Sequence, residues 1–223
     1  VLHYRDEGYS SDAVLNYLVR LGWSKGDQEI FSVQEMIDGF DLSGINKSSA
    51  KFDIEKLRWV NQQHLMHTNN DQLKLMVETQ SEIAKNLNDE TLSNFIDAYK
   101  NRANTINDLV SNCDKLFSTE INYDQASAEK FLKKKIVSPL EDVADALKNS
   151  DWNQESISGV LKSVCDTHEI GFGKIGQPIR IAVTGGTQSP SIDQTLILLD
   201  QETVIDRIEA AIAYIKENSN EES

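Results

Sequence analysis

The chain lacks the segments expected of a membrane protein or of a disulfide-rich secreted protein. Among its 223 residues, no run approaches the roughly 20 apolar residues that span a bilayer, and no basic-then-apolar leader opens the chain. Its two cysteines, Cys113 and Cys165, lie far apart and form no CxxC motif. This pattern suits a reducing compartment, so we expect a cytoplasmic protein that contacts no membrane. Because the chain starts at Val1 and not at Met, we expect it to be a fragment.

Basic residues are also scarce. Lysine and arginine total 22 against 36 aspartates and glutamates, which gives a net charge of −14. A nucleic-acid-binding protein usually carries a basic patch, so the net charge alone favours a protein-interaction or metabolic role. The one dense basic run is Lys133–Lys135. A solvated face is the ordinary interpretation of such a run, and contact with phosphate is the alternative.

The sequence holds no recognisable catalytic or metal-binding motif. No GxGxxG or Gly-Lys-Ser/Thr loop follows its Gly-Gly pair, and no Ser/His/Asp or Cys/His arrangement is visible. His64 and His67 are three residues apart, but no third ligand accompanies them. We therefore expect no catalytic residue and no metal ligand in this chain.

Helical patterns fill most of the N-terminal third. Apolar residues recur at helical spacing after the capping oxygens of 10–12, and Gly22 ends that pattern. A capping box at 32–35 starts a second helix. A third begins near Phe52, and three apolar positions are predicted to face inward: Phe52, Leu57, and either Val60 or Trp59. Tryptophans at such positions are more often core residues than stacking platforms, so we assign Trp23 and Trp59 to the core.

The remaining two thirds indicate further helices. Residues 62–148 form a nearly continuous helical pattern, with breaks at 86–89 and 117–119. A capped helix follows residues 149–155, and two more follow Pro190. No internal repeat of 20–50 residues is evident. The sequence therefore predicts an all-α protein.

One stretch, 176–190, stands out because it contains two of the three prolines and the Gly-Gly pair. Proline removes a backbone donor and glycine opens positive φ, so helices are expected to stop here. Arg180 lies within this stretch among Ile179, Ile181 and other apolar residues. Such an arginine is either paired inside a core or held rigidly to meet a ligand, since a guanidinium binds planar acceptor pairs through parallel donors.

Several segments together carry a resemblance to a known family. They are residues 8–9, 15–24, 27–31, 52–61, and 177–185 (QPIRIAVTG) with the Ser-Pro of 189–190. In this order they resemble the C-terminal region of bacterial-type glutamyl-tRNA synthetases, which are class I enzymes. The likeness covers nearly the whole chain. It implies an elongated set of helical bundles: a stem-contact region (1–65) and two anticodon-binding helical subdomains (66–148 and 149–223).

The resemblance also implies how an anticodon would be read. Residues 98–109, with their spacing to 115–117, are similar to the family's stretch that carries the arginine facing the last anticodon base, and the matching residue is Arg102. Cytosine presents adjacent acceptors on its pairing edge and guanine presents donors, so a guanidinium favours C over G. The ordinary alternative is that Arg102 pairs with Asp97 or Asp108 on a helix.

Four further residues match family positions that contact tRNA. Arg180, Ser189 and Ile192 match places near the anticodon loop, with Arg180 and Arg102 expected on facing helical layers. Lys56 matches a residue that touches the tRNA backbone near the D arm. The alternative for Lys56 is that it lies on a solvated helix face. The alternative for Arg180 is that it forms a buried ion pair.

Taken together, the likeness implies the tRNA(Glu)-recognising part of a glutamate–tRNA ligase. Neither His-x-Gly-His nor Lys-Met-Ser-Lys-Ser occurs. ATP, Mg²⁺ and glutamate are therefore expected in a catalytic domain outside the chain, and this piece, a monomer, should not aminoacylate alone. One alternative is a non-discriminating enzyme that charges both tRNA(Glu) and tRNA(Gln). Another is an acidic helical scaffold that binds protein.

Overall fold

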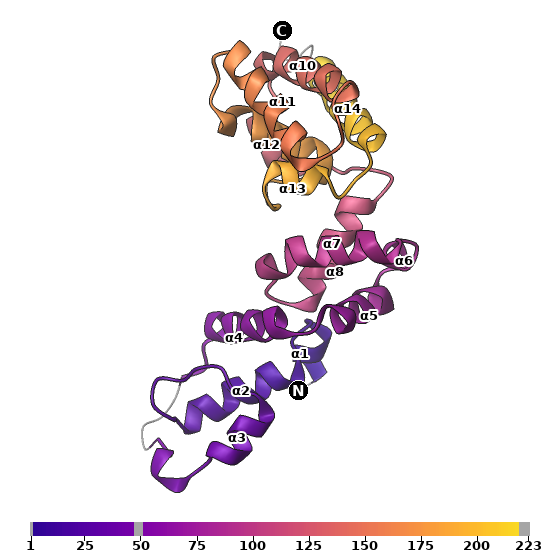
Figure 1. Cartoon of the computed structure of the whole chain (residues 1–223). Helices are drawn as coiled ribbons and strands as arrows, with labels where there is room; N and C mark the ends of the chain where they lie inside the picture. The colour runs from indigo at the N-terminus through magenta and orange to yellow at the C-terminus, as the bar shows by residue number, and fades with distance from the viewer. Residues whose placement is uncertain (1, 47–50, 219–223) are drawn as a thin grey trace. The chain divides into compact units, whose positions relative to one another are not determined.

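The structure, a computed structural model, describes residues 2–46 and 51–218 (Figure 1). Within these ranges every regular element is a helix, and the one β-type contact is an isolated bridge between Trp23 and Ile45. The predicted all-α class is confirmed. The chain groups into two compact units, Val1–Cys113 (unit 1) and Asp114–Ser223 (unit 2), which are described separately.

Unit 1 consists of short and medium helices. In chain order they are α1 (Leu2–Asp6), α2 (Ser11–Gly22), α3 (Val33–Gly39), η1 (Leu42–Gly44), α4 (Ile54–His67), α5 (Asn70–Gln80), α6 (Glu82–Lys85), α7 (Asp89–Tyr99), η2 (Lys100–Arg102) and α8 (Ile106–Phe117). The unit boundary falls inside α8. The two predicted breaks, at 86–89 and 117–119, both coincide with helix ends.

Unit 2 contains the remaining helices. They are α9 (Gln125–Phe131), η3 (Lys134–Ile136), α10 (Val137–Lys148), α11 (Gln154–Thr167), α12 (Phe172–Thr184), α13 (Ile192–Leu196) and α14 (Gln201–Asn218). The boundary at 113/114 lies within the predicted region 66–148. The finer division at 65/66 and 148/149 stays a prediction.

The helix starts in unit 1 follow from local capping chemistry. The Ser10 hydroxyl accepts a hydrogen bond of 3.1 Å from the Ala13 amide at the start of α2. At α3, Ser32 and Glu35 form the reciprocal capping box that the sequence predicts. Each cap satisfies an amide that the helix itself leaves without an acceptor.

Two apolar clusters hold the first four helices together. Side chains of α2 and α4, with Tyr9 from the segment before α2, form one cluster, which consists of Tyr9, Ala13, Tyr17, Leu57 and Val60. The second consists of Trp23, Phe31 and Met36. Trp23 is therefore a core residue as predicted, but the same prediction for Trp59 is wrong, because its side chain is 38% exposed. Phe52 is also exposed; it precedes α4, and its ring packs edge-on against Tyr17.

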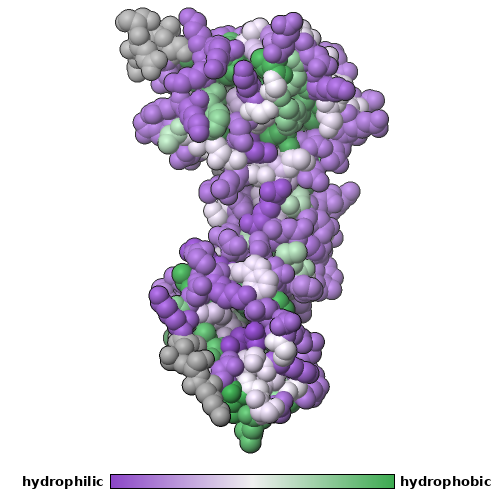
Figure 2. Space-filling view, turned by 90° about the vertical axis from the view of Figure 1, so that its left-hand side faces the viewer, coloured by the Kyte–Doolittle hydropathy of each residue, from purple (hydrophilic) through white to green (hydrophobic). Residues whose placement is uncertain are grey.

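Some apolar residues of unit 1 remain uncovered at one end. Figure 2 shows apolar atoms gathered where α3 and η1 lie. The exposed residues there are Ile37, Phe40, Leu42 and Ile45.

Helix α12 is the central element of unit 2. It packs against α9, α10, α11, α13 and α14, and its buried side chains include Ile175, Ile179 and Val183. The prediction that helices stop in the stretch 176–190 is wrong for its first part, because α12 begins at Phe172 and runs through Pro178. A proline inside a helix costs about 3 kcal/mol. Burial of α12 against these neighbouring helices offsets that cost. The helix ends where predicted, with Gly185 in the left-handed region (φ 76°).

Candidate nucleic-acid interface

Arg102 lies on a turn whose backbone is fixed from both sides. It ends η2, immediately after α7. The Gln62 side chain donates a 3.1 Å hydrogen bond to the carbonyl of Asn101, and the Asn61 side chain donates to the carbonyl of Asn104. Both donors come from α4, so this helix clamps the turn one residue before Arg102 and two residues after it.

A second set of bonds fixes the segment after Arg102. The Asp108 carboxylate accepts from the amides of Asn104 (2.9 Å) and Thr105 (3.0 Å), and the Thr105 hydroxyl accepts from the Asp108 amide. This reciprocal arrangement caps the start of α8. Its signal in the sequence is Thr-x-x-Asp at 105–108, which the sequence reasoning missed.

The Arg102 side chain itself is exposed. Among the residues that the structure describes, it makes no hydrogen bond and no ion pair. Asp97 is engaged by Asn70 and Lys100, and Asp108 by the backbone amides of the α8 cap. The alternative that Arg102 pairs with Asp97 or Asp108 is therefore wrong. A fixed backbone carries a guanidinium whose donors face solvent.

Gly8, which follows α1, packs closely against the start of α8. Its carbonyl accepts from the Ile106 amide at 3.1 Å, and its φ is +83°. A Cβ at this position would lie 2.6 Å from the side-chain oxygen of Asn107 and 2.8 Å from the backbone nitrogen of the same residue. Only glycine allows this approach at this φ. Asn107 in turn donates to the carbonyl of Asp6 at 2.9 Å.

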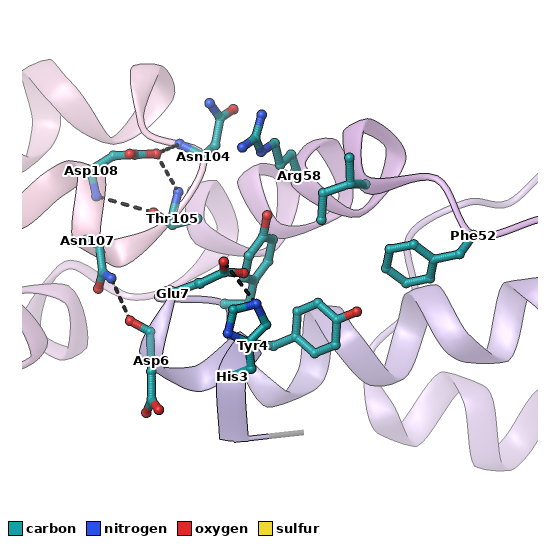
Figure 3. A pocket seen from close by; sticks show the side chains of 12 residues that line it. His3, Tyr4, Asp6, Glu7, Phe52, Arg58, Asn104, Thr105, Asn107 and Asp108 are labelled. Carbon is teal, nitrogen blue, oxygen red and sulfur yellow. Dashed lines mark hydrogen bonds and ion pairs between the residues drawn. The ribbon is translucent and has the colours of Figure 1, made fainter.

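An open cavity of about 840 Å³ lies beside this contact (Figure 3). His3 and Glu7 pair with each other at its edge, and Asp108 and Asn107 point to their backbone partners. Arg58 also lines it, and a hydrogen bond with Tyr9 raises the pKa of this arginine. These polar groups mostly satisfy one another, so the cavity region serves to hold α1 and the start of α8 together.

In unit 2, Arg180 is held by the turn that follows α12. Its Nε donates to the Ser189 hydroxyl at 2.8 Å, Nη2 donates to the Pro190 carbonyl at 3.0 Å, and Nη1 to the Thr187 carbonyl at 3.4 Å. These three bonds orient the guanidinium. The turn therefore holds the Arg180 side chain in one direction.

Ser189 and Ile192, which the resemblance places with Arg180 near the anticodon loop, are both buried; Ser189 bonds to Arg180 directly. Ser189 is 7% exposed and Ile192 is 2% exposed. The Ser189 hydroxyl lies 2.9 Å from that of Thr195 and donates to the Pro190 carbonyl. Their side chains thus shape the turn around Arg180.

Lys56 is part of a small charged network on α4. Its Nζ lies 3.1 Å from Glu29 and 4.1 Å from the centroid of the Trp59 ring. Glu29 also meets Arg20 at 3.6 Å. Two nitrogens of Arg20, Nε and Nη1, are buried without a partner among the described residues. The Lys56 side chain remains 40% exposed, so it is tethered and still accessible.

Other residues considered from the sequence have simpler roles. The Nε2 atom of His64 lies 2.9 Å from the side-chain oxygen of the buried Asn16. Burial lowers the pKa of His64. Across residues 2–46 and 51–218, no three His, Cys, Asp or Glu side chains gather as a metal ion would require. The three side chains of Lys133–Lys135 are exposed.

Arg207 is a residue that the sequence reasoning missed. It is 9% exposed, and it donates to the carbonyls of Leu116 (2.8 Å), Val183 (2.7 Å) and Ser118 (2.7 Å). Burial lowers the pKa of Arg207. The available signal was its position between Val204 and Ala211 on the apolar face of α14. It ties the end of α8 to the end of α12 within unit 2.

Comparison with family models identifies the class of protein. Residues 61–212 match the anticodon binding domain, and residues 1–59 match the catalytic domain of class I tRNA synthetases (E and Q). The first match covers more than half of the chain, which therefore belongs to the anticodon-binding domain family.

The curated relatives narrow this class. A glutamate–tRNA ligase 1 of Alkalilimnicola ehrlichii is 40% identical over 224 residues, and one of Coxiella burnetii is 38% identical over 218 residues. Each alignment covers 96% of this chain and 46% of the relative. The chain thus spans about half the length of the curated relatives it matches. The likeness to glutamyl-tRNA synthetases expected from the sequence is confirmed.

Solved structures of glutamyl-tRNA synthetases have the same fold over the part that this chain matches. A glutamate tRNA ligase from Elizabethkingia meningosepticum, crystallised with its amino acid, superposes with a TM-score of 0.82 at 28% identity, over 95% of this chain and 43% of that one. A glutamate-tRNA synthetase from Elizabethkingia anophelis gives 0.77 at 29% identity, over 94% and 42%. Across the described part of the chain, no helix has the length and apolar character needed to span a bilayer.

Proposed function

We propose that this chain is the tRNA-binding part of a glutamate–tRNA ligase and that it reads the anticodon with a preference for C over G at the last base. The family and the relatives support the tRNA partner. The observation that carries the base preference is the exposed guanidinium of Arg102, which lies on a clamped turn and has no partner within residues 2–46 and 51–218.

The preference follows from donor and acceptor matching. A guanidinium offers donors only, so it satisfies the O2 and N3 acceptors of cytosine and meets guanine donor to donor. A clamped backbone limits how far the side chain can move to avoid that mismatch. By analogy with base readout in general, one such contact supplies about 1–3 kcal/mol of discrimination.

Arg180 is proposed to contact the anticodon loop directly. Ser189 and the Pro190 carbonyl hold its guanidinium, so little side-chain entropy is lost on binding. Ser189 and Ile192 then act by shaping the site, because their side chains are almost fully covered. This proposal keeps all three residues at the anticodon but gives the contact to the arginine.

Lys56 is proposed to contact a backbone phosphate of the tRNA. Its ion pair with Glu29 and its place over Trp59 fix the direction of the side chain. A single phosphate contact changes the salt dependence of binding by about one ion. We further propose that the protein binds tRNA(Glu) as a monomer, and that glutamate and ATP with Mg²⁺ bind in the part of the relatives that this chain does not match.

The test is a titration of the chain with a tRNA(Glu) transcript at increasing salt. We expect affinity to fall with salt, and Lys56→Ala to make the dependence shallower by about one ion. Lys85→Ala is the matched control, because Lys85 pairs with Glu82 elsewhere in unit 1. Absence of tRNA binding at low salt would contradict the proposal and favour a protein-binding scaffold. Equal binding of C- and G-ending anticodons would favour a non-discriminating enzyme.

A further inference from the structure

The first residue of α12, Phe172, is an aromatic side chain that the fold leaves uncovered. It is 52% exposed, and among the described residues of unit 2 it is the only large hydrophobic side chain that is exposed. All other large apolar residues of this unit are at least partly covered. A single exposed apolar residue needs no explanation by itself. The position of Phe172, next to Gly176 and near the turn that holds Arg180, is what suggests a role for it.

One face of the Phe172 ring lies against helix α12 itself. Gly176, one turn further along α12, has no side chain, and a Cβ there would lie 3.3 Å from Cε1 of Phe172 and 3.5 Å from Cγ1 of Ile192. The ring therefore lies against the helix backbone at Gly176 and close to Ile192. Its other side faces solvent. This geometry presents an aromatic surface with a restricted orientation.

Phe172 also lies on the same side of the helix as Arg180. Positions 172, 176 and 180 are four residues apart, which is the spacing of neighbours on one helix face. A rise of 1.5 Å per residue separates the first and last by about 12 Å. Ile192, beside Gly176, follows the Ser189–Pro190 turn that holds Arg180. The aromatic ring and the guanidinium thus border the same turn.

We propose that Phe172 is a stacking platform for an unpaired base of the anticodon loop, at a nucleotide next to the one contacted by Arg180. This inference rests on the proposed function, since it requires an RNA loop at Arg180. Unpaired RNA bases stack on aromatic side chains, and removing one platform weakens binding by about 5-fold to 100-fold. Stacking tolerates any base, so Phe172 adds affinity and loop geometry, while the arginines add selectivity.

The test compares a flat ring with an apolar side chain of similar size. Phe172→Leu keeps an apolar side chain over Gly176 but removes the π face, whereas Phe172→Trp keeps the π face. We expect the leucine variant to bind tRNA(Glu) about tenfold more weakly and the tryptophan variant to bind like the parent chain. Phe40→Leu is the matched control, because Phe40 is 56% exposed in unit 1, and should leave affinity unchanged.

Transcripts that lack one base at a time in the anticodon loop locate the contact. At the stacked position, loss of the base should weaken binding to the parent chain but weaken binding to Phe172→Leu no further. If Phe172→Leu binds like the parent while Arg180→Ala is weakened, stacking is overturned and the proposed function stands. If neither change alters affinity, the stacking by Phe172 and the proposed contact of Arg180 are both overturned. Equal weakening by the leucine and tryptophan variants, with lowered melting temperatures, would reduce Phe172 to a packing role and overturn the proposal.

Discussion

The Nε atom of Arg180 donates a 2.8 Å hydrogen bond to the hydroxyl of Ser189, nine residues further along the chain. This bond closes the turn after α12 and, with the bonds to the Thr187 and Pro190 carbonyls, fixes the direction of the guanidinium. Sequence proximity alone does not imply such a bond. It depends on α12 continuing through Pro178 and ending at Gly185.

Replacing Ser189 tests whether this orientation matters. Ser189→Ala removes the acceptor for Nε, and we expect tRNA affinity to fall by a smaller factor than in Arg180→Ala, about threefold to tenfold by the usual value of one hydrogen bond. Thr187→Ala is the control, because Thr187 binds Arg180 through its backbone carbonyl. Equal affinity of Ser189→Ala and the parent chain, measured by filter binding, would show that the hydroxyl does not position Arg180.

Gly8 should tolerate no side chain. Gly8→Ala adds a Cβ 2.6 Å from Asn107 at a φ of +83°, so we expect a loss of more than about 2 kcal/mol in the free energy of unfolding. Gly26→Ala is the control, because Gly26 also has positive φ but a Cβ there meets nothing within 4 Å. Urea denaturation compares the two. Similar losses for both variants would mean that the contact with Asn107 adds nothing.

Arg207 should be essential for the stability of unit 2. Arg207→Met removes the donor from three carbonyl oxygens, two of them in buried hydrogen bonds, and we expect a loss of about 3 kcal/mol in the free energy of unfolding. Arg5→Met, at a largely exposed arginine beside Asp6, should change stability by less than about 0.5 kcal/mol. A melting temperature of Arg207→Met equal to that of the parent chain would contradict this role.

The buried environment of His64 predicts a pH effect. Burial lowers its pKa below the ordinary 6.5, so the folded state disfavours the charged ring. Its contribution to stability is therefore fully present above the unfolded pKa and is lost as pH falls from about 6.5 through the lowered folded value. We expect His64→Gln to flatten the loss of melting temperature between pH 7 and pH 5. If the melting temperatures of the parent chain and His64→Gln fall in parallel between pH 7 and pH 5, His64 is not the source of this pH effect.

Local chemistry made much of the fold predictable. Capping residues such as Ser10 and Ser32 act within three residues of their partners, so the starts of α2 and α3 follow from the sequence. The positive φ of Gly185 likewise marks the end of α12. The errors at Pro178 and Trp59 have a common reason. Whether a proline is tolerated, or a tryptophan is covered, depends on which helices pack alongside.

The candidate site was predictable only in part. The resemblance selects Arg102, but the bonds that fix its turn come from residues far away in sequence, Asn61 and Gln62. The buried state of Ser189 and Ile192 likewise depends on how the turn folds back on α12. Arg207 carries no sequence motif, because a buried arginine is recognised by the carbonyls around it.

The most direct measurement is the ratio of affinities for two tRNA(Glu) transcripts that differ only in C or G at the last anticodon base. For the parent chain we expect a preference for C of about 10-fold or more, and for Arg102→Gln a ratio close to one. Lys100→Gln is the matched control, since Lys100 in the same turn is engaged by Asp97 and Asn70, and it should keep the preference. An unchanged ratio in Arg102→Gln would contradict the central claim that Arg102 reads this base.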